Sequence, residues 1–85
     1  MAKYTVRLSK KAEKFLDKTP DHIAVSILKA LGYLAEDPRP QGYIKLKGQD
    51  AYRIRVGNYR VIYQIVDKIL VVEVIDIGHR KEVYG

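Results

Sequence analysis

Neither cysteine nor tryptophan occurs among the 85 residues of this sequence, and histidine occurs only twice. Without cysteine, no disulfide framework and no thiolate metal site can hold the fold. The two histidines, His22 and His79, lie far apart in the sequence, and carboxylates alone make a poor cage for a transition metal. We therefore expect neither a bound metal nor a cofactor.

Long apolar runs are also missing. No stretch approaches the roughly 20 apolar residues of a membrane span, and the first residues contain no apolar run of signal-peptide length. We therefore expect a soluble, cytoplasmic protein. The sequence shows no repeat, no low-complexity stretch and no linker, and a chain this short buries only about 60–65% of its unfolded surface. Residues 1–85 are thus expected to form a single domain.

Positive charge exceeds negative charge. The sequence contains 16 Lys and Arg residues against 10 Asp and Glu residues, which gives a formal net charge of +6 at pH 7. An excess of this kind favours a polyanionic partner, either a nucleic acid or an acidic protein. Net charge alone does not distinguish a protein that binds such a partner from a basic domain that binds neither. The positions of the charged residues are therefore needed to choose between these two interpretations.

The first 16 residues change from an alternating pattern to a helical one. Residues 3–8 alternate between apolar and polar side chains, which predicts a half-buried strand. Ser9 is a suitable N-cap for a short helix that carries Ala12, Phe15 and Leu16 at helical spacing. The sequence therefore predicts a strand followed at once by a helix.

A second helix is predicted after Thr19 and Pro20, which read as an N-cap and the first helical position. Five apolar residues then recur at helical spacing: Ile23, Ile27, Ala30, Leu31 and Leu34. The helix should end at Asp37, because the residue before a proline avoids the helical region. Two helices joined by so short a link should form a hairpin.

The second half of the chain is predicted to form strands. Residues 52–56 and 59–66 flank Gly57-Asn58, a two-residue turn of the kind that closes hairpins, and a further strand over 69–77 follows a turn at Asp67-Lys68. The expected order β-α-α-β-β-β gives an α+β fold, with the helical hairpin on one face of a small, largely antiparallel sheet. The tyrosines expected to pack in the core or on strands are Tyr33, Tyr43, Tyr52, Tyr59 and Tyr63. Function should be sought on the uncovered face of the sheet.

Three arginines are predicted to share that face. A two-residue turn sets Val56 opposite Tyr59 and Arg55 opposite Arg60, and Arg53 has the same parity as Arg55. Arginines placed directly opposite each other repel, so a sequence selected for stability alone would rarely keep them. We call Arg53, Arg55 and Arg60 the arginine face.

The arginine face is interpreted as a phosphate-binding surface. Arginine forms forked contacts with phosphate, and Lys45 and Lys47 lead into the same region. The alternative is that the arginines merely solvate an exposed sheet, or pair with Glu73 and Asp76 on the neighbouring strand.

The C-terminal segment can bring further groups to this surface. If strand parity continued unbroken from Glu73, His79 would point to the arginine face and Arg80 away from it, whereas a bend at Gly78 would reverse this. Tyr84 offers a ring for stacking on a base and a hydroxyl for proton transfer. The alternatives are that His79 is a surface residue without a role and that Tyr84 fills a hydrophobic gap.

Three runs of the sequence resemble the RelE family of bacterial and archaeal toxins, which belongs to the RelE/ParE superfamily. They are Lys-Leu-Lys-Gly at 45–48, Tyr-Arg-Ile-Arg-Val-Gly-Asn-Tyr-Arg-Val-Ile-Tyr at 52–63, and Ile-Gly-His-Arg at 77–80 with Val-Tyr at 83–84. The resemblance covers almost the whole chain. The central run is typical of the superfamily and does not separate the RNA-cleaving branch from the branch that poisons DNA gyrase. The closing Gly-x-Arg with Val-Tyr is more similar to the RNA-cleaving branch.

This resemblance implies a toxin of a type II toxin–antitoxin system. Such toxins cleave mRNA in the ribosomal A site, where the 2′-hydroxyl attacks the adjacent phosphate and leaves a 2′,3′-cyclic phosphate and a 5′-hydroxyl. The partners implied are the ribosome, its mRNA and a cognate acidic antitoxin. Arg60 and Arg80 match arginines that clamp the scissile phosphate, and Tyr84 matches a tyrosine implicated in stacking and proton transfer. Lys45, Lys47 and His79 are expected to bind RNA.

Arg53 and Arg55 stand where the family often has two lysines, and this departure affects the expected mechanism. An arginine stays protonated at any accessible pH, so neither residue can accept the proton of the 2′-hydroxyl. The base then becomes Tyr84, with an ordinary pKa of about 10, His79, with one of about 6.5, or a group of the RNA or ribosome. Two other functions stay open: a ParE-like inhibitor of DNA gyrase, and an inactive module of the same fold that binds RNA or protein.

Overall fold

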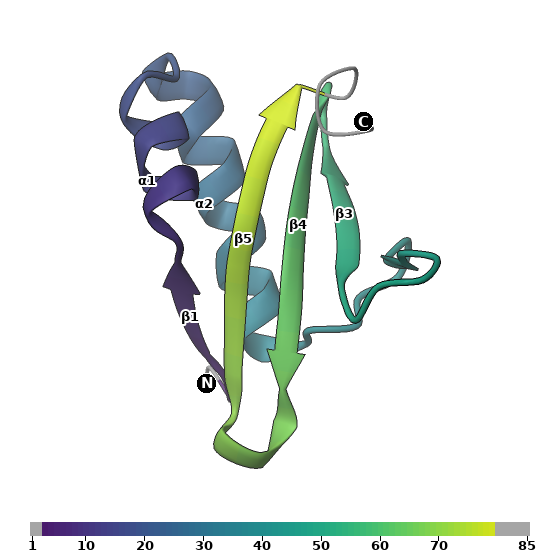
Figure 1. Ribbon diagram of the computed structural model, residues 1–85. Helices are drawn as coiled ribbons and strands as arrows, with labels where there is room; N and C mark the ends of the chain where they lie inside the picture. Colours follow the sequence, from purple (N-terminus) through teal and green to yellow (C-terminus); the bar gives the residue numbers. More distant parts are fainter. Residues whose placement is uncertain (1–2, 80–85) are drawn as a thin grey trace.

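A computed structural model describes residues 3–79 as two helices packed on one face of a five-stranded mixed sheet (Figure 1). The elements in chain order are β1 (Thr5–Leu8), α1 (Lys10–Asp17), α2 (Asp21–Glu36), β2 (Ile44–Lys45), β3 (Tyr52–Val56), β4 (Tyr59–Val66), the 3-10 turn η1 (Asp67–Ile69) and β5 (Val71–His79). The predicted α+β architecture is confirmed. The third long strand runs over 71–79 instead of 69–77, because η1 lengthens the turn before it.

The sheet has the order β1-β5-β4-β3-β2. Its β1–β5 pair is parallel and the other pairs are antiparallel, as the prediction of a largely antiparallel sheet requires. Two parallel strands need a long connection between them. The connection from β1 to β5 starts with α1 and α2 and continues through β2, β3 and β4. The short edge strand β2 was not predicted, because two residues are too few to show an alternating pattern.

The starts of the two helices differ in how well they were predicted. The Ser9 hydroxyl accepts a hydrogen bond from the Ala12 N–H at 3.1 Å, so Ser9 is the N-cap of α1 as expected. The prediction of Thr19 as the next N-cap is wrong: Pro20 holds that position, and the Thr19 hydroxyl donates to the Phe15 carbonyl oxygen at 2.6 Å. The carbonyls in the last turn of a helix have no partner within the helix, so they compete for such a hydroxyl. Within residues 3–79, neither helix is both long and apolar enough to cross a membrane.

The core lies between α2 and the sheet. Its buried residues include Ile27, Leu31, Leu34, Ile54, Val61, Tyr63, Val72, Val74 and Ile77. The Tyr63 hydroxyl donates a hydrogen bond to the Pro38 carbonyl oxygen at 2.7 Å, which ties the loop after α2 to the sheet. The packing predicted for Tyr52, Tyr59 and Tyr63 is confirmed.

Two of the five tyrosines lie outside the core. Tyr43, in the loop before β2, is exposed, but its ring centroid lies 5.8 Å from that of Tyr52 of β3, so its predicted packing on a strand is confirmed. The prediction for Tyr33 is wrong, because this residue is 70% exposed. Tyr33 lies between Leu31 and Leu34 in sequence but off their apolar stripe, because each helical residue is turned about 100° from the one before it.

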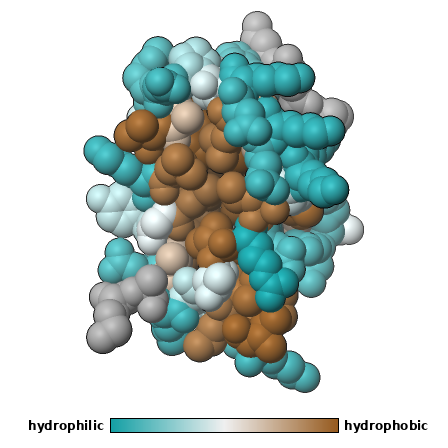
Figure 2. Space-filling model, turned by 90° about the vertical axis from the view of Figure 1, so that its left-hand side faces the viewer, coloured by the Kyte–Doolittle hydropathy of each residue, from teal (hydrophilic) through white to brown (hydrophobic). Residues whose placement is uncertain are grey.

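Seen from the side on which β1 and the helices lie, the surface has an apolar area bordered by hydrophilic residues (Figure 2). The exposed apolar residues of α2 include Val25 and Leu28.

Asp67, which directly follows the last residue of β4, connects three parts of the chain. Its carboxylate accepts a hydrogen bond from the Tyr4 hydroxyl at 2.6 Å and from the Arg39 guanidinium at 3.0 Å. These two donors, Arg39 foremost, lower the pKa of the Asp67 carboxyl below its ordinary value. The contacts join the N-terminal segment, the loop after α2 and the turn η1.

A β-bulge in β5 decides which side chains face the helices. Tyr63 pairs with Val74 but Ile62 pairs with Asp76, so Ile75 is an extra residue in β5. The extra residue reverses the parity of the strand beyond it. The reversal considered for Gly78 therefore occurs three residues earlier, at Ile75.

Candidate phosphate-binding site

The hairpin of β3 and β4 has the register predicted from the sequence. Val56 pairs with Tyr59, Arg55 with Arg60, and Arg53 with Ile62. Gly57 has φ 59° whereas Asn58 has no positive φ, the pattern of a type II′ turn, which favours glycine at its first central position. Because Ile54 and Val61 face the core, the arginine face lies on the side of the sheet away from the helices.

Burial distinguishes the three arginines. Arg53 and Arg60 are each only 4% exposed, whereas Arg55 is exposed. Arginine is rarely buried this deeply, because removing a guanidinium from water is unfavourable. A cation in such surroundings interacts more strongly with an anion than one in water does, because the local dielectric constant is lower. The arginine face therefore combines two buried guanidinium groups with one exposed group.

Gly78 is the cross-strand neighbour of Arg60 on β5. A glycine at this position places no side chain opposite Arg60 on β5. The sequence pointed to Gly78 only as a place where the strand could bend, and its position opposite Arg60 depends on the bulge at Ile75. The pairing leaves Arg55, on the other neighbouring strand, as the side chain directly opposite Arg60.

The carboxylates of β5 form ion pairs with other residues. Glu73 lies 3.8 Å from Arg7 of β1, and Asp76 lies 3.3 Å from Lys11 of α1. Both acids share the parity of the arginine face, so they are the residues that the alternative interpretation requires. Within residues 3–79, their ion pairs are with Arg7 and Lys11, and this removes the main support for that alternative.

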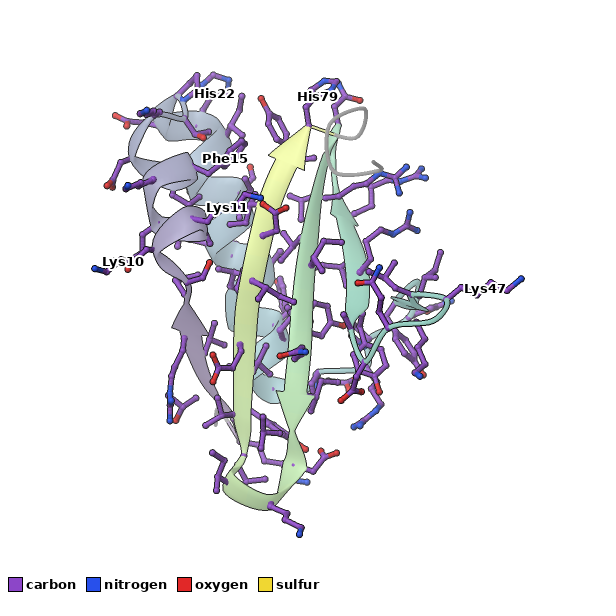
Figure 3. The ribbon with its side chains drawn as sticks, in the orientation of Figure 1. Lys10, Lys11, Phe15, His22, Lys47 and His79 are labelled. Atoms are coloured by element: carbon purple, nitrogen blue, oxygen red, sulfur yellow. The ribbon has the colours of Figure 1, made fainter. Side chains whose placement is uncertain are left out.

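The two predicted lysines do not lie on the arginine face. Lys45 pairs with Tyr52 in β2 and β3, which places it on the opposite side of the sheet, while Ile44 is the neighbour of Arg53. Lys47 is exposed in the loop before β3, and its side chain extends away from the sheet (Figure 3). Their contribution to RNA binding stays a prediction.

His79 lies on the helix side of the sheet. It pairs with Tyr59, and the two rings meet edge to face with centroids 5.6 Å apart. Tyr59 in turn contacts the Phe15 ring of α1, with centroids 5.8 Å apart. The bulge at Ile75 is the reason, since it turns His79 away from the face that carries Arg60. Arg80 and Tyr84 lie outside the described residues.

The described part of the site suits phosphate binding better than proton transfer. Guanidinium groups donate hydrogen bonds and carry a permanent positive charge, so they can hold a phosphodiester and stabilise negative charge that develops on it. They cannot accept a proton at accessible pH. A proton acceptor therefore has to come from outside the arginine face.

Comparisons with known proteins give consistent matches over nearly the whole chain. A sequence model of the family described as the ParE toxin of the type II toxin–antitoxin system parDE matches residues 6–84. The mRNA interferase toxin RelE of Escherichia coli K12 is 34% identical over an alignment of 87 positions, which covers 96% of this chain and 90% of that protein.

Solved structures agree in fold as well as in sequence. The archaeal RelE–RelB complex from Pyrococcus horikoshii OT3 contains a chain with a TM-score of 0.82 and 32% identity, covering 92% of this chain and 96% of that one. A chain of the intact E. coli RelBE toxin–antitoxin complex has a TM-score of 0.78 and 33% identity, covering 89% of this chain and 95% of that one.

Proposed function

Because the chain belongs to the RelE/ParE superfamily of type II toxins, we propose that it is a ribosome-dependent endonuclease that cleaves mRNA in the A site. The observation that carries this proposal is the arginine face, which places Arg55 directly opposite a buried Arg60 with Arg53 beside them. Such a cluster suits a phosphodiester. The name of the E. coli relative, an mRNA interferase toxin, supports the same reaction class.

The reaction proposed is an attack of the 2′-hydroxyl oxygen on the adjacent phosphorus. A bond forms between these two atoms while the bond from phosphorus to the 5′-oxygen of the next nucleotide breaks. The 2′-hydroxyl loses its proton and the departing 5′-oxygen gains one, so the products are a 2′,3′-cyclic phosphate and a 5′-hydroxyl. Arg53, Arg55 and Arg60, together with Arg80, stabilise the negative charge on the phosphate as it becomes pentacoordinate.

The proton of the 2′-hydroxyl needs another acceptor. The packing of His79 against Tyr59 favours Tyr84, or a group of the RNA or ribosome, over His79 as this base. To act as this base, the Tyr84 hydroxyl would need cations that stabilise its charged form. Lys45, Lys47 and His79 then serve RNA binding and not proton transfer.

An acidic antitoxin is the proposed protein partner in the cytoplasm. The net charge of +6 suits an acidic protein, and the solved structures that match include toxin–antitoxin complexes. A partner that binds only the folded toxin should also stabilise it by mass action.

Primer extension on a translated message after induction of the toxin tests the proposed function. We expect cuts confined to translated codons, which disappear with Arg60→Ala and persist with Lys29→Ala, a matched change at an exposed residue of α2. Cuts outside translated codons would argue against a ribosome-dependent reaction. Cuts that survive Arg60→Ala would argue against the arginine face.

The second candidate function is inhibition of DNA gyrase, favoured by the description of the matching family as a ParE toxin. DNA breaks that accumulate on induction while mRNA stays intact would establish this function in place of RNA cleavage.

A further inference from the structure

A cleft lies between α1 and the last residues of β5. β1 pairs with β5 only as far as Leu8 and Val74, and α1 takes its place beside the strand beyond that point. The cleft has a volume of about 310 Å³. Its lining includes Lys11, Lys14 and Phe15 from α1, Lys18 at the C-cap of that helix, and Asp76 and Gly78 from β5. We call it the α1 cleft.

The lysines of the α1 cleft lie on one side of the helix. Lys11, Lys14 and Lys18 are three and four residues apart, which places them in one row. Figure 3 shows Lys11 and Phe15 extending from α1 toward β5, while Lys10 extends away from the sheet. Like charges at this spacing destabilise a helix. The helix dipole offsets this effect near the C-terminus of α1, but it opposes a cation in the first turn, where Lys11 lies.

The positive charges of the α1 cleft are only partly compensated. Within residues 3–79, its one ion pair joins Lys11 to Asp76 at 3.3 Å. Three ammonium groups and one carboxylate leave two positive charges in excess. The Phe15 ring packs edge to face against the Tyr59 ring and forms an apolar wall of the cleft.

The α1 cleft adjoins the arginine face. Gly78 lines the cleft and is also the strand neighbour of Arg60. Neighbouring strands are about 5 Å apart, so the cleft begins about one strand spacing from Arg60. Asp76, which binds Lys11, shares the parity of the arginine face. A polyanion held by the arginines can therefore continue into the cleft.

We propose that the α1 cleft is a second subsite for an RNA backbone, in which Lys11, Lys14 and Lys18 bind phosphate groups. This proposal rests on the proposed function, since it extends the path of RNA from the arginine face. Lysine binds phosphate as a point charge, so the subsite contributes affinity and position but no base specificity. The phosphates belong to the message on either side of the cleaved bond, or to ribosomal RNA beside it.

Salt dependence of RNA binding tests the α1 cleft. The probe is a short single-stranded RNA with a 2′-O-methyl group at every position, which cannot be cleaved by 2′-hydroxyl attack. Each phosphate contact contributes about 0.7 to the magnitude of the negative slope of log affinity against log salt concentration. Losing three contacts therefore reduces the magnitude of this slope by about 2. We expect this decrease, with weaker binding, for the full chain carrying Lys11→Gln, Lys14→Gln and Lys18→Gln.

The matched control carries Lys3→Gln, Lys29→Gln and Lys68→Gln, three exposed lysines that do not line the cleft. It has the same net charge as the cleft variant, so any difference between the two reports position and not total charge. Glutamine preserves helix propensity, and equal melting temperatures would verify that both variants are folded. A slope that decreases equally in both variants would overturn the proposal.

Two further measurements identify the source of the phosphates and exclude a protein ligand. Weaker binding by the cleft variant to message-free small ribosomal subunits, with unchanged binding to the short RNA, would support the subsite and assign it to ribosomal RNA. If the cleft variant bound both RNAs like the control but lost affinity for the acidic antitoxin, the cleft would be a protein interface and the proposal wrong. Arg60→Ala keeps the two proposals apart: cleavage that survives it contradicts the proposed function and leaves the RNA-binding result intact.

Discussion

Arg55 and Arg60 occupy paired positions, yet they differ in burial, and this difference predicts unequal effects on cleavage. Two unit charges 4 Å apart interact by about 1 kcal/mol in water but by about 4 kcal/mol at an effective dielectric constant of 20. The exposed Arg55 corresponds to the first case and Arg60, which is 4% exposed, to the second. With about 1.4 kcal/mol for each factor of ten, Arg60→Ala should slow cleavage on the order of 1,000-fold and Arg55→Ala only about 5-fold.

Single-turnover cleavage of a message on stalled ribosomes measures both effects directly. Saturating concentrations of toxin separate the chemical step from binding. Arg60→Lys serves as a second variant, because it keeps the charge but loses the forked contact, and its rate should lie between those of the wild type and Arg60→Ala. Each variant is compared only after its melting temperature shows that it is folded. Equal losses for Arg55→Ala and Arg60→Ala would refute the argument from burial.

Three other predictions follow from contacts away from the arginine face. Tyr63→Phe leaves a buried carbonyl without its donor, so it should destabilise the protein by about 1–3 kcal/mol and lower the melting temperature by about 4–8 °C per kcal/mol. The same change at Tyr33, which is exposed, is the control, and equal melting temperatures would contradict the role of the buried hydrogen bond. The lowered pKa of the Asp67 carboxyl means that its ionisation stabilises the folded state above about pH 4, a contribution that is lost as the pH falls through that lowered pKa. Asp67→Asn should therefore weaken the loss of stability in acid, as followed by denaturant unfolding at several pH values, and an unchanged acid profile would count against these hydrogen bonds. His79→Gln should leave the dependence of the cleavage rate on pH unchanged, whereas the loss of an ionisation from that dependence would identify His79 as the base.

The arginine face could be predicted because its geometry depends on neighbouring residues. A two-residue turn at Gly57-Asn58 sets the hairpin register, and strand alternation then places Arg53 on the same side as Arg55 and Arg60. Both effects act over fewer than a dozen residues. The position of α2 was predictable for a similar reason, since its apolar stripe and the proline after Asp37 are local signals.

The positions of Lys45 and His79 could not be predicted in the same way. Lys45 faces away from the arginines because the strand β2 pairs Ile44 with Arg53, and two residues carry no periodic signal. His79 faces the helices because of the bulge at Ile75, which forms only when β5 pairs with β4. The helical spacing of Lys11, Lys14 and Lys18 is present in the sequence, but the cleft that they line forms only because α1 packs beside β5.

By itself, then, the sequence determined the order of the two helices and the four longer strands, the hairpin register and the presence of three arginines on one face, because hydrogen-bonded turns and side-chain periodicity act along the chain. Only the tertiary structure decided that Arg53 and Arg60 are buried while Arg55 is exposed, that Gly78 is the neighbour of Arg60, and that His79 lies against Tyr59. These features arise from pairing and packing between segments far apart in the sequence. A bulge of one residue in β5 is enough to reverse the sides of the sheet that Gly78 and His79 face.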